Sequence, residues 1–164
     1  MRRMILLVTT LLLLLVVNVT IYQREHLISD GRMVLLELAP VDPRSLMQGD
    51  YMALRFQVAN QAFSDQNLKR LDDGHLVLAL DERNVATFTR FADGSPLAES
   101  EVLLRYRIRN GRSRLATNAF FFQEGTAKEY ERAKFGEFRV AQNGESILTR
   151  LRDEELKVLG LEEQ

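Results

Sequence analysis

The residues "EVLLRYRIRNGRSRLAT", Glu101 to Thr117, decide the fold class. Apolar and arginine side chains alternate along them, which is the period-two pattern of a strand with one face in the core. The pair Asn110-Gly111 interrupts the alternation, and Asn-Gly accepts the positive φ angles of a type I′ turn. The stretch therefore predicts an antiparallel hairpin. Its expected pairs are Arg109 with Arg112 and Arg107 with Arg114.

The same alternation recurs along most of the chain. A second Asn-Gly pair, Asn143-Gly144, predicts another hairpin of the same type. The pattern predicts about seven to eight mostly antiparallel strands. The alternating segments are 33–39, 51–58, 75–80, 84–91, 101–108, 112–117, 136–140 and 145–151. The expected core residues are Met52, Leu54, Phe56, Leu78, Leu80, Tyr106, Ile108, Val140 and Ile147.

Two segments have helical rather than alternating patterns, at 60–71 and 126–136. In the second, Thr126 and Glu129 have the spacing of a capping box, and Gly136 is a typical C-terminal stop. No repeat or linker divides this part of the chain. The fold expected is a β-rich α+β domain: mostly antiparallel strands with one or two short helices.

An apolar segment precedes this domain. Met4 to Tyr22 carries no charge, and its nineteen residues would span roughly 28 Å as a helix, close to the hydrocarbon thickness of a bilayer. We expect an uncleaved transmembrane anchor, prolonged as a short helical stalk that ends at Gly31. A cleaved signal peptide is the alternative, although no pair of small residues precedes a plausible cleavage site.

The charges beside the apolar segment predict its orientation. Arg2 and Arg3 precede it, and the positive-inside rule favours a cytoplasmic N-terminus. We therefore expect residues 1–25 to be a cytoplasmic tip and transmembrane anchor. Residues 26–164 would form an extracytoplasmic domain on the periplasmic side of a bacterial inner membrane.

Composition excludes several classes of function. Without Arg2 and Arg3, the chain has 20 basic residues against 23 acidic ones, which is no electrostatic footprint for nucleic acid. It contains no cysteine, and its two histidines, His26 and His75, are isolated in the sequence. We therefore expect no disulfide, no metal site and no cofactor.

The stretch "APVDPRSLMQGDYMALRF", Ala39 to Phe56, combines turn residues with the start of a strand. Asp42 and Pro43 have the pattern of an N-cap followed by the first helical residue, so Arg44 to Gln48 can form one helical turn. Gly49 would end that turn. Asp50 then falls on the strand face expected to lie in the core, where a carboxylate needs a partner. It can find one within the turn or in Arg44. The apolar side chains expected on that face are Met52, Leu54, Phe56 and Val58.

These residues also carry a family resemblance. "GDYMALRF" resembles the signature of the bacterial GDYXXLXY family, with Phe56 in place of the final tyrosine. The segments "LAPVDPRSLMQ", "TNAFFFQEG" and "KFGEFRV" are similar to the family as well. The resemblance implies a membrane-anchored protein of uncharacterised function, often encoded beside multi-pass membrane proteins. The candidate site comprises Asp42, Pro43, Arg44, Gly49, Asp50, Tyr51, Leu54, Phe56, Gln123, Glu124, Gly125 and Tyr130.

The predicted hairpin offers a second candidate surface. Period two places five arginines on one face of it: Arg105, Arg107, Arg109, Arg112 and Arg114. Like charges directly opposite one another are unfavourable in a strand pair. The arginines are either solvated and paired with acidic side chains of the domain, or they form a patch for anionic lipid headgroups or an acidic partner surface.

The sequence leaves an enzyme and a binding module open. A membrane-anchored hydrolase would use Asp50 and Glu124 as acid and base, or Ser45 in a signal-peptidase-like role. Ser45 lacks the expected neighbours and a suitable lysine. Glu124 precedes a predicted helix, where an acidic residue commonly does no more than complement the helix dipole. We favour a non-catalytic assembly module that partners a multi-pass inner-membrane protein.

Overall fold

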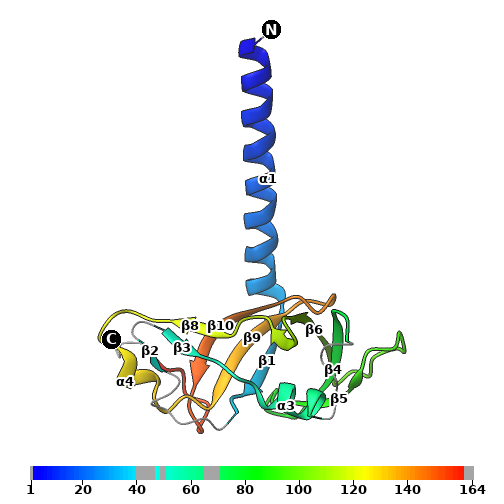
Figure 1. Cartoon of the computed structure of the whole chain (residues 1–164), viewed down its shortest axis with the longest axis vertical. Helices are drawn as coiled ribbons and strands as arrows, with labels where there is room; N and C mark the ends of the chain where they lie inside the picture. The colour runs from blue at the N-terminus through cyan, green and yellow to red at the C-terminus, as the bar shows by residue number, and fades with distance from the viewer. Residues whose placement is uncertain (1, 40–46, 49–50, 65–70, 161–164) are drawn as a thin grey trace.

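The chain folds into one long helix that rises from a β-rich domain (Figure 1). The computed structural model describes residues 2–39, 47–48, 51–64 and 71–160. Helix α1 (Arg2–Asp30) stands clear of the domain along most of its length, and the chain enters the domain at β1 (Arg32–Glu37). The expected order of an apolar helix followed by antiparallel sheets and short helices is confirmed.

Helix α1 has the length and composition of a membrane span. Its part Leu6–Asp30 has a mean hydropathy of 2.1 over its most apolar window, and 0% of that window is buried. The helix ends at Gly31, as expected, where the Gly31 N–H donates to the Leu27 carbonyl over 3.0 Å. Leu27 is 8% exposed and packs against the domain. Such a helix is consistent with a signal anchor or with a signal sequence.

The first sheet has the order β1-β9-β10 and continues directly from α1. Strands β9 (Phe135–Val140) and β10 (Ser146–Arg152) form an antiparallel pair, as the second Asn-Gly pair predicts. The turn type differs from the expected one, because only Gly144 of the pair Asn143-Gly144 has a positive φ. The Ala141 N–H donates to the Glu145 carbonyl over 2.8 Å, so the connection is longer than a two-residue type I′ turn.

A register shift in β10 moves one expected core residue out of the core. Ile147 pairs with Arg139, whereas Leu148 pairs with the fully buried Phe138. The shift lies between Leu148 and Arg150, and it lets Leu148 and Leu151 both pack inward. Strict alternation would have placed Ile147 on the face of Leu151. The expectation for Ile147 was therefore wrong, and the bulge is the reason.

The second sheet contains the hairpin that predicted the fold. Its order is β5-β4-β6-β7, with β5 (Ala86–Phe91), β4 (Gly74–Leu80), β6 (Glu101–Arg109) and β7 (Arg112–Leu115). Asn110 and Gly111 both have positive φ, at 54° and 68°, as a type I′ turn requires. The expected pairs are confirmed: Arg109 lies opposite Arg112, and Arg107 lies opposite Arg114.

The third sheet is small and has the order β2-β3-β8. It comprises β2 (Met47–Gln48), β3 (Tyr51–Ala53) and β8 (Ala119–Phe121). The strand expected over 51–58 ends at Ala53, and helix α3 (Gln57–Phe63) begins where it should have continued. The expected faces nevertheless hold, since the even-numbered side chains of this segment are buried: Met52, Leu54, Phe56 and Val58.

The second predicted helix is much shorter than expected. Helix α4 (Ala127–Tyr130) has a single turn, and the Thr126 hydroxyl donates to the Gln123 carbonyl over 2.7 Å instead of capping the helix. Gly136 belongs to β9, so it is not a helix stop. A Cβ at Gly136 would lie 3.0 Å from the Phe138 ring. Close packing inside the sheet therefore explains this glycine, and the capping box and the stop were both wrong.

The sheets surround one hydrophobic core. Its fully buried members include Val34, Leu36, Leu78, Leu104 and Phe138, which come from β1, β4, β6 and β9. Of the expected core residues, Leu80 and Ile108 are only partly buried at its edge. The described residues form ten strands. This exceeds the expected number because β2 and β8 are too short to show an alternating pattern.

Candidate functional site

The "GDYMALRF" segment lies in the small sheet, and its described part is structural. Leu54 and Phe56 belong to the core, where the Phe56 and Phe138 rings meet edge to face at 5.4 Å. Tyr51 is half-buried on β3 and lies directly opposite Phe121 of β8, with ring centroids 5.8 Å apart. The remaining candidates of this segment lie outside the described residues: Asp42, Pro43, Arg44, Ser45, Gly49 and Asp50.

The second family segment, "TNAFFFQEG", lies beside the first. Strand β8 pairs with β3 through Tyr51–Phe121, Met52–Phe120 and Ala53–Ala119. The two segments that resemble the family are therefore neighbours in one sheet, although more than fifty residues of sequence separate them. Sequence patterns do not reveal this pairing, because no short turn joins the strands.

The residues after β8 form an aromatic cluster and an exposed loop. The buried Tyr130 ring lies between Phe120 and Phe122, at 5.2 and 5.3 Å. Burial raises the pKa of the Tyr130 hydroxyl, and the neighbouring Glu129 adds to the effect. Gln123 and Glu124 are exposed, and Gly125 has a φ of 89°. Glu124 has no hydrogen bond or ion pair with any described residue. No described feature supports the hydrolase alternative.

The arginine face is present as expected, and two acidic residues neutralise part of it. Asp73 binds Arg109 through two hydrogen bonds of 2.9 Å and accepts a third from the Ile108 N–H. The Arg109 hydrogen bond, followed by the Ile108 one, lowers the pKa of Asp73. Glu145 lies 3.6 Å from Arg105.

The other three arginines of this face are exposed and form no ion pair with any described residue. They are Arg107, Arg112 and Arg114. Arg105 lies opposite His75 of β4. Sequence analysis missed Asp73, His75 and Glu145. The acidic pair Asp72 and Asp73, directly before the strand at 75–80, was the available signal for neutralising side chains. Only the sheet order, which places β4 beside β6, shows that this pair lies near the arginines.

A groove lies where α1 meets the domain. It has a volume of about 1260 Å³. Residues of α1 between Thr20 and Asp30 line one side, and Glu101 to Leu103 of β6 and the loop between β9 and β10 line the other. On the helical wall of the groove, Nδ1 of His26 lies 2.9 Å from a carboxylate oxygen of Asp30, and both side chains are exposed. The described parts of the chain contain no cluster of three or more His, Asp or Glu side chains able to hold a metal ion.

Comparison with known proteins agrees with the resemblance in the sequence. The family model described as "GDYXXLXY protein" matches residues 13–151. No curated protein and no solved structure matches the chain. The matched range includes most of α1 and every strand of the three sheets up to Leu151. The chain therefore belongs to the GDYXXLXY family.

Proposed function

We propose that this protein is a membrane-anchored assembly module without catalytic activity of its own. In this proposal α1 crosses a bacterial inner membrane once, with Arg2 and Arg3 on the cytoplasmic side and the β-rich domain in the periplasm. The helix then binds a helix of a multi-pass membrane protein. The genes of such proteins often lie beside those of the family that the sequence resembles.

The observation that carries the proposal is Asn18. It lies inside the apolar part of α1 and is exposed. Its Nδ2 atom donates to the Leu14 carbonyl over 2.8 Å, and no described residue donates to its Oδ1 atom. The nearby Thr20 hydroxyl, by contrast, uses its single proton on the Val16 carbonyl. Asn18 therefore keeps unused hydrogen-bonding capacity in a segment that lipid would surround.

A second transmembrane helix satisfies this need. Asparagine side chains hydrogen-bond across transmembrane helices, with about 0.6 to 2 kcal/mol per contact. The rest of the exposed surface of α1 is mainly leucine and valine, which packs equally well against lipid or protein. Asn18 therefore gives the helix one preferred contact face.

Site-specific photocrosslinking in native membranes tests the proposal. Leu11 lies about 20° from Asn18 around the helix, whereas Leu13 lies on the opposite side. A photoreactive residue at position 11 should crosslink the full chain to one larger membrane protein, and the same residue at position 13 should not. Asn18→Leu should reduce the crosslink at position 11.

Two outcomes would contradict the proposal. Equal crosslinking at both positions would mean that no face of α1 is preferred. A product with twice the mass of this 18.9 kDa chain would indicate self-association instead. Protease added to spheroplasts tests the orientation, because it should digest the domain while a cytoplasmic control protein stays intact.

A further inference from the structure

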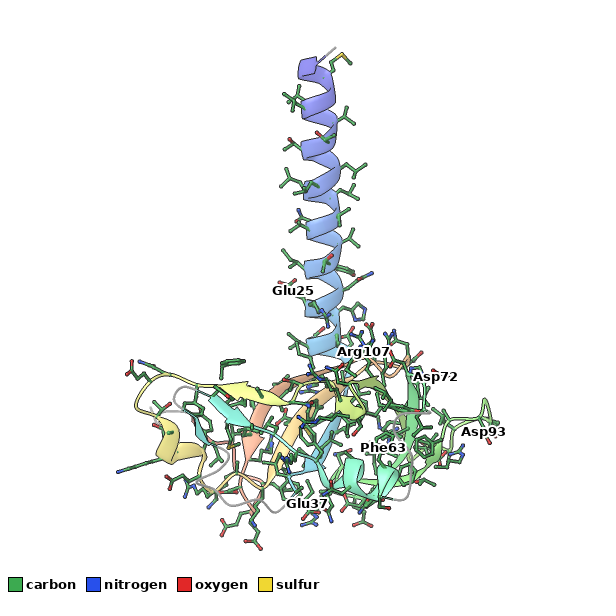
Figure 2. The ribbon with its side chains drawn as sticks, in the orientation of Figure 1. Glu25, Glu37, Phe63, Asp72, Asp93 and Arg107 are labelled. Carbon is green, nitrogen blue, oxygen red and sulfur yellow. The ribbon has the colours of Figure 1, made fainter. Side chains whose placement is uncertain are left out.

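The unpaired arginines lie on the side of the domain from which α1 rises. Figure 2 shows Arg107 beside the foot of the helix, whereas Glu37 lies at the far side of the domain. The contacts agree with this placement. The Arg105 N–H donates to the Gly144 carbonyl over 2.9 Å, and the loop that holds Gly144 lines the groove against α1. The arginine face therefore continues the surface around the helix foot.

This surface is close to any bilayer that α1 crosses. The uncharged segment ends at Tyr22, and the helix ends at Asp30, eight residues later. That length of helix rises about 12 Å. The headgroup layer of one leaflet is about 5 to 7 Å thick. The remaining gap is smaller than the Debye length of about 8 Å at physiological salt, so charges on this surface still feel the headgroups.

Acidic side chains of the described part of the domain cancel the charge on this surface only in part. Arg107 and Arg114 lie directly opposite one another across β6 and β7, and Arg112 lies beside them on β7. Asp73 forms its ion pair with Arg109 and attracts Arg107 only at longer range, and Glu145 pairs with Arg105. An external anion would therefore relieve the repulsion that the strand pairing creates.

An exposed aromatic side chain accompanies the arginines. Phe121 of β8 is 75% exposed, and β8 runs along the same side of the domain as the foot of α1 (Figure 1). The segment around β8 contacts that region, since Ala119, Phe120 and Arg24 of α1 line one shallow pocket. Basic and aromatic residues together are typical of surfaces that lie in the headgroup region of a bilayer.

We propose that this face docks on anionic phospholipid headgroups of the leaflet from which α1 emerges. Arg107, Arg112 and Arg114 bind lipid phosphates, and Phe121 contacts the interface on the other side of the helix. The inference rests on the proposed function only in requiring that α1 spans the membrane. Docking holds the domain in one orientation, so that the partner-binding face of α1 and the domain approach a partner together.

Lipid fits this face better than an acidic protein does, because of where the face lies. A surface around the foot of a membrane helix faces the headgroup layer whenever the helix is inserted. Guanidinium groups bind phosphate oxygens with two parallel hydrogen bonds. Each arginine near an anionic surface contributes about fivefold to binding, so three contribute about 100-fold.

The test uses the full chain in vesicles and one fluorescent label. The chain has no cysteine, so Asn118→Cys gives a single labelling site. Asn118 is exposed, and its neighbours Thr117 and Ala119 line the pocket with Arg24. Lipids with a nitroxide on the headgroup quench the label when the face is docked. Quenching should be stronger in vesicles that contain phosphatidylglycerol than in phosphatidylcholine alone. It should fall at about 1 M salt, where the Debye length is about 3 Å.

Matched variants show whether the arginines are responsible. Arg107→Glu with Arg114→Glu should lower the docking equilibrium constant by at least about 25-fold in anionic vesicles. Arg132→Glu with Lys134→Glu is the control with the same change in charge. Lys134 lies at the far end of β1, where its carbonyl accepts from the Leu38 N–H. The control should dock like the original protein.

A single substitution separates docking from folding. Arg107→Glu places opposite charges across the strand pair, which favours the hairpin and offsets the lost attraction to the exposed Asp73. It also changes the charge of the face by two units. It should weaken docking while the unfolding midpoint stays the same or rises. Weaker docking together with a lower midpoint would instead indicate damage to the fold and would overturn the assignment to the arginines.

The remaining outcomes separate this inference from the proposed function. Quenching that is equal in anionic and neutral vesicles, with the protein floating with the vesicles after alkaline extraction, would overturn the lipid-docking inference alone. Loss of the protein from the vesicles on alkaline extraction would show that α1 does not span the bilayer, and both proposals would fail. Unchanged docking of the Arg107→Glu, Arg114→Glu variant would overturn the role of the arginines.

Discussion

Glu137 and Arg152 form an ion pair inside the domain, with Nη2 of the arginine 2.6 Å from Oε2 of the glutamate. Glu137 is 3% exposed and is the buried charged residue of the described core. The Arg152 Nε atom also donates to Oε2 over 2.7 Å, and its Nη1 atom donates to the Leu156 carbonyl. Both charged groups therefore have hydrogen-bond partners within the domain. These bonds link β9 to β10 and link β10 to the segment around Leu156.

Removing the arginine should be costly, because it leaves a buried carboxylate without its partner. Arg152→Ala should lower the free energy of unfolding by about 3 to 5 kcal/mol. Chemical denaturation of the full chain in a mild detergent, followed by circular dichroism, measures this loss. Arg83→Ala is the matched control, because Arg83 pairs with Asp81 on the surface. It should cost no more than about 1 kcal/mol.

Replacing both partners at once distinguishes a buried pair from a general packing effect. Glu137→Leu with Arg152→Met should be less destabilising than Arg152→Ala alone, because no unpaired charge remains. If the double variant were at least as unstable as the single one, the loss would come from packing of the Arg152 side chain rather than from the charge.

Leu54 tests whether the family signature is structural. It is 4% exposed in the core, so Leu54→Ala should lower the free energy of unfolding by about 2 to 5 kcal/mol. Leu97, which is 39% exposed, is the matched control, and Leu97→Ala should change stability by less than about 0.5 kcal/mol. An equally small change at Leu54 would mean that its side chain does not pack in the core.

Sequence alone predicted the parts of the fold that depend on local patterns. The hairpin at Asn110-Gly111 follows from alternation and turn chemistry, and both are local. The segment 51–58 shows the limit of this reasoning, since Val58 is buried as expected but belongs to a helix. A buried side chain every second residue is compatible with a strand followed by the first turn of a helix. The periodicity therefore identified the core face and missed the change of backbone.

The candidate site was less predictable, because its contacts join segments that are distant in sequence. Asp73 neutralises Arg109 from the end of a neighbouring strand, and Tyr51 meets Phe121 only because β3 pairs with β8. Gly136 had the pattern of a helix stop, yet its place in β9 is set by pairing with Leu36. Sheet order decides each of these contacts, and no local pattern in the sequence encodes it.

The Asp73–Arg109 pair predicts a dependence of stability on pH. The pKa of Asp73 is lowered in the folded protein, by the Arg109 hydrogen bond first. Its contribution to stability is therefore fully present above the unfolded value of about 3.9 and is lost as the pH falls through the lower folded value. Asp73→Asn should destabilise the protein at pH 7, and the difference from the original protein should shrink below about pH 3.9. A difference that is the same at acidic and neutral pH would exclude the carboxylate charge as its source.

Gly144 should be intolerant of a side chain for two separable reasons. Its φ of +80° is a left-handed conformation, and a Cβ there would lie 2.7 Å from Cδ2 of His75. Gly94 has a similar φ of +87° with open space around it, so Gly94→Ala has only the backbone cost of about 1 kcal/mol. Gly144→Ala should have a larger cost, because the imidazole or the turn must also move. Denaturation midpoints of the two variants measure the difference.

A third substitution shows whether His75 is the cause. In the Gly144→Ala background, His75→Ala should restore part of the lost stability, because it removes the ring that the new methyl group meets. The coupling between the two positions should be about 0.5 to 3 kcal/mol, the range for residues in direct contact. The carbonyl of Gly144 accepts a hydrogen bond from the Arg105 N–H. This turn therefore closes the β9–β10 hairpin and also helps to position the arginine face. Simple additivity of the two substitutions would contradict this packing of the turn on His75. The cost would then come from backbone strain and from the close approach of the new Cβ to the Arg105 nitrogen and the Leu103 Cβ, at 3.2 and 3.3 Å.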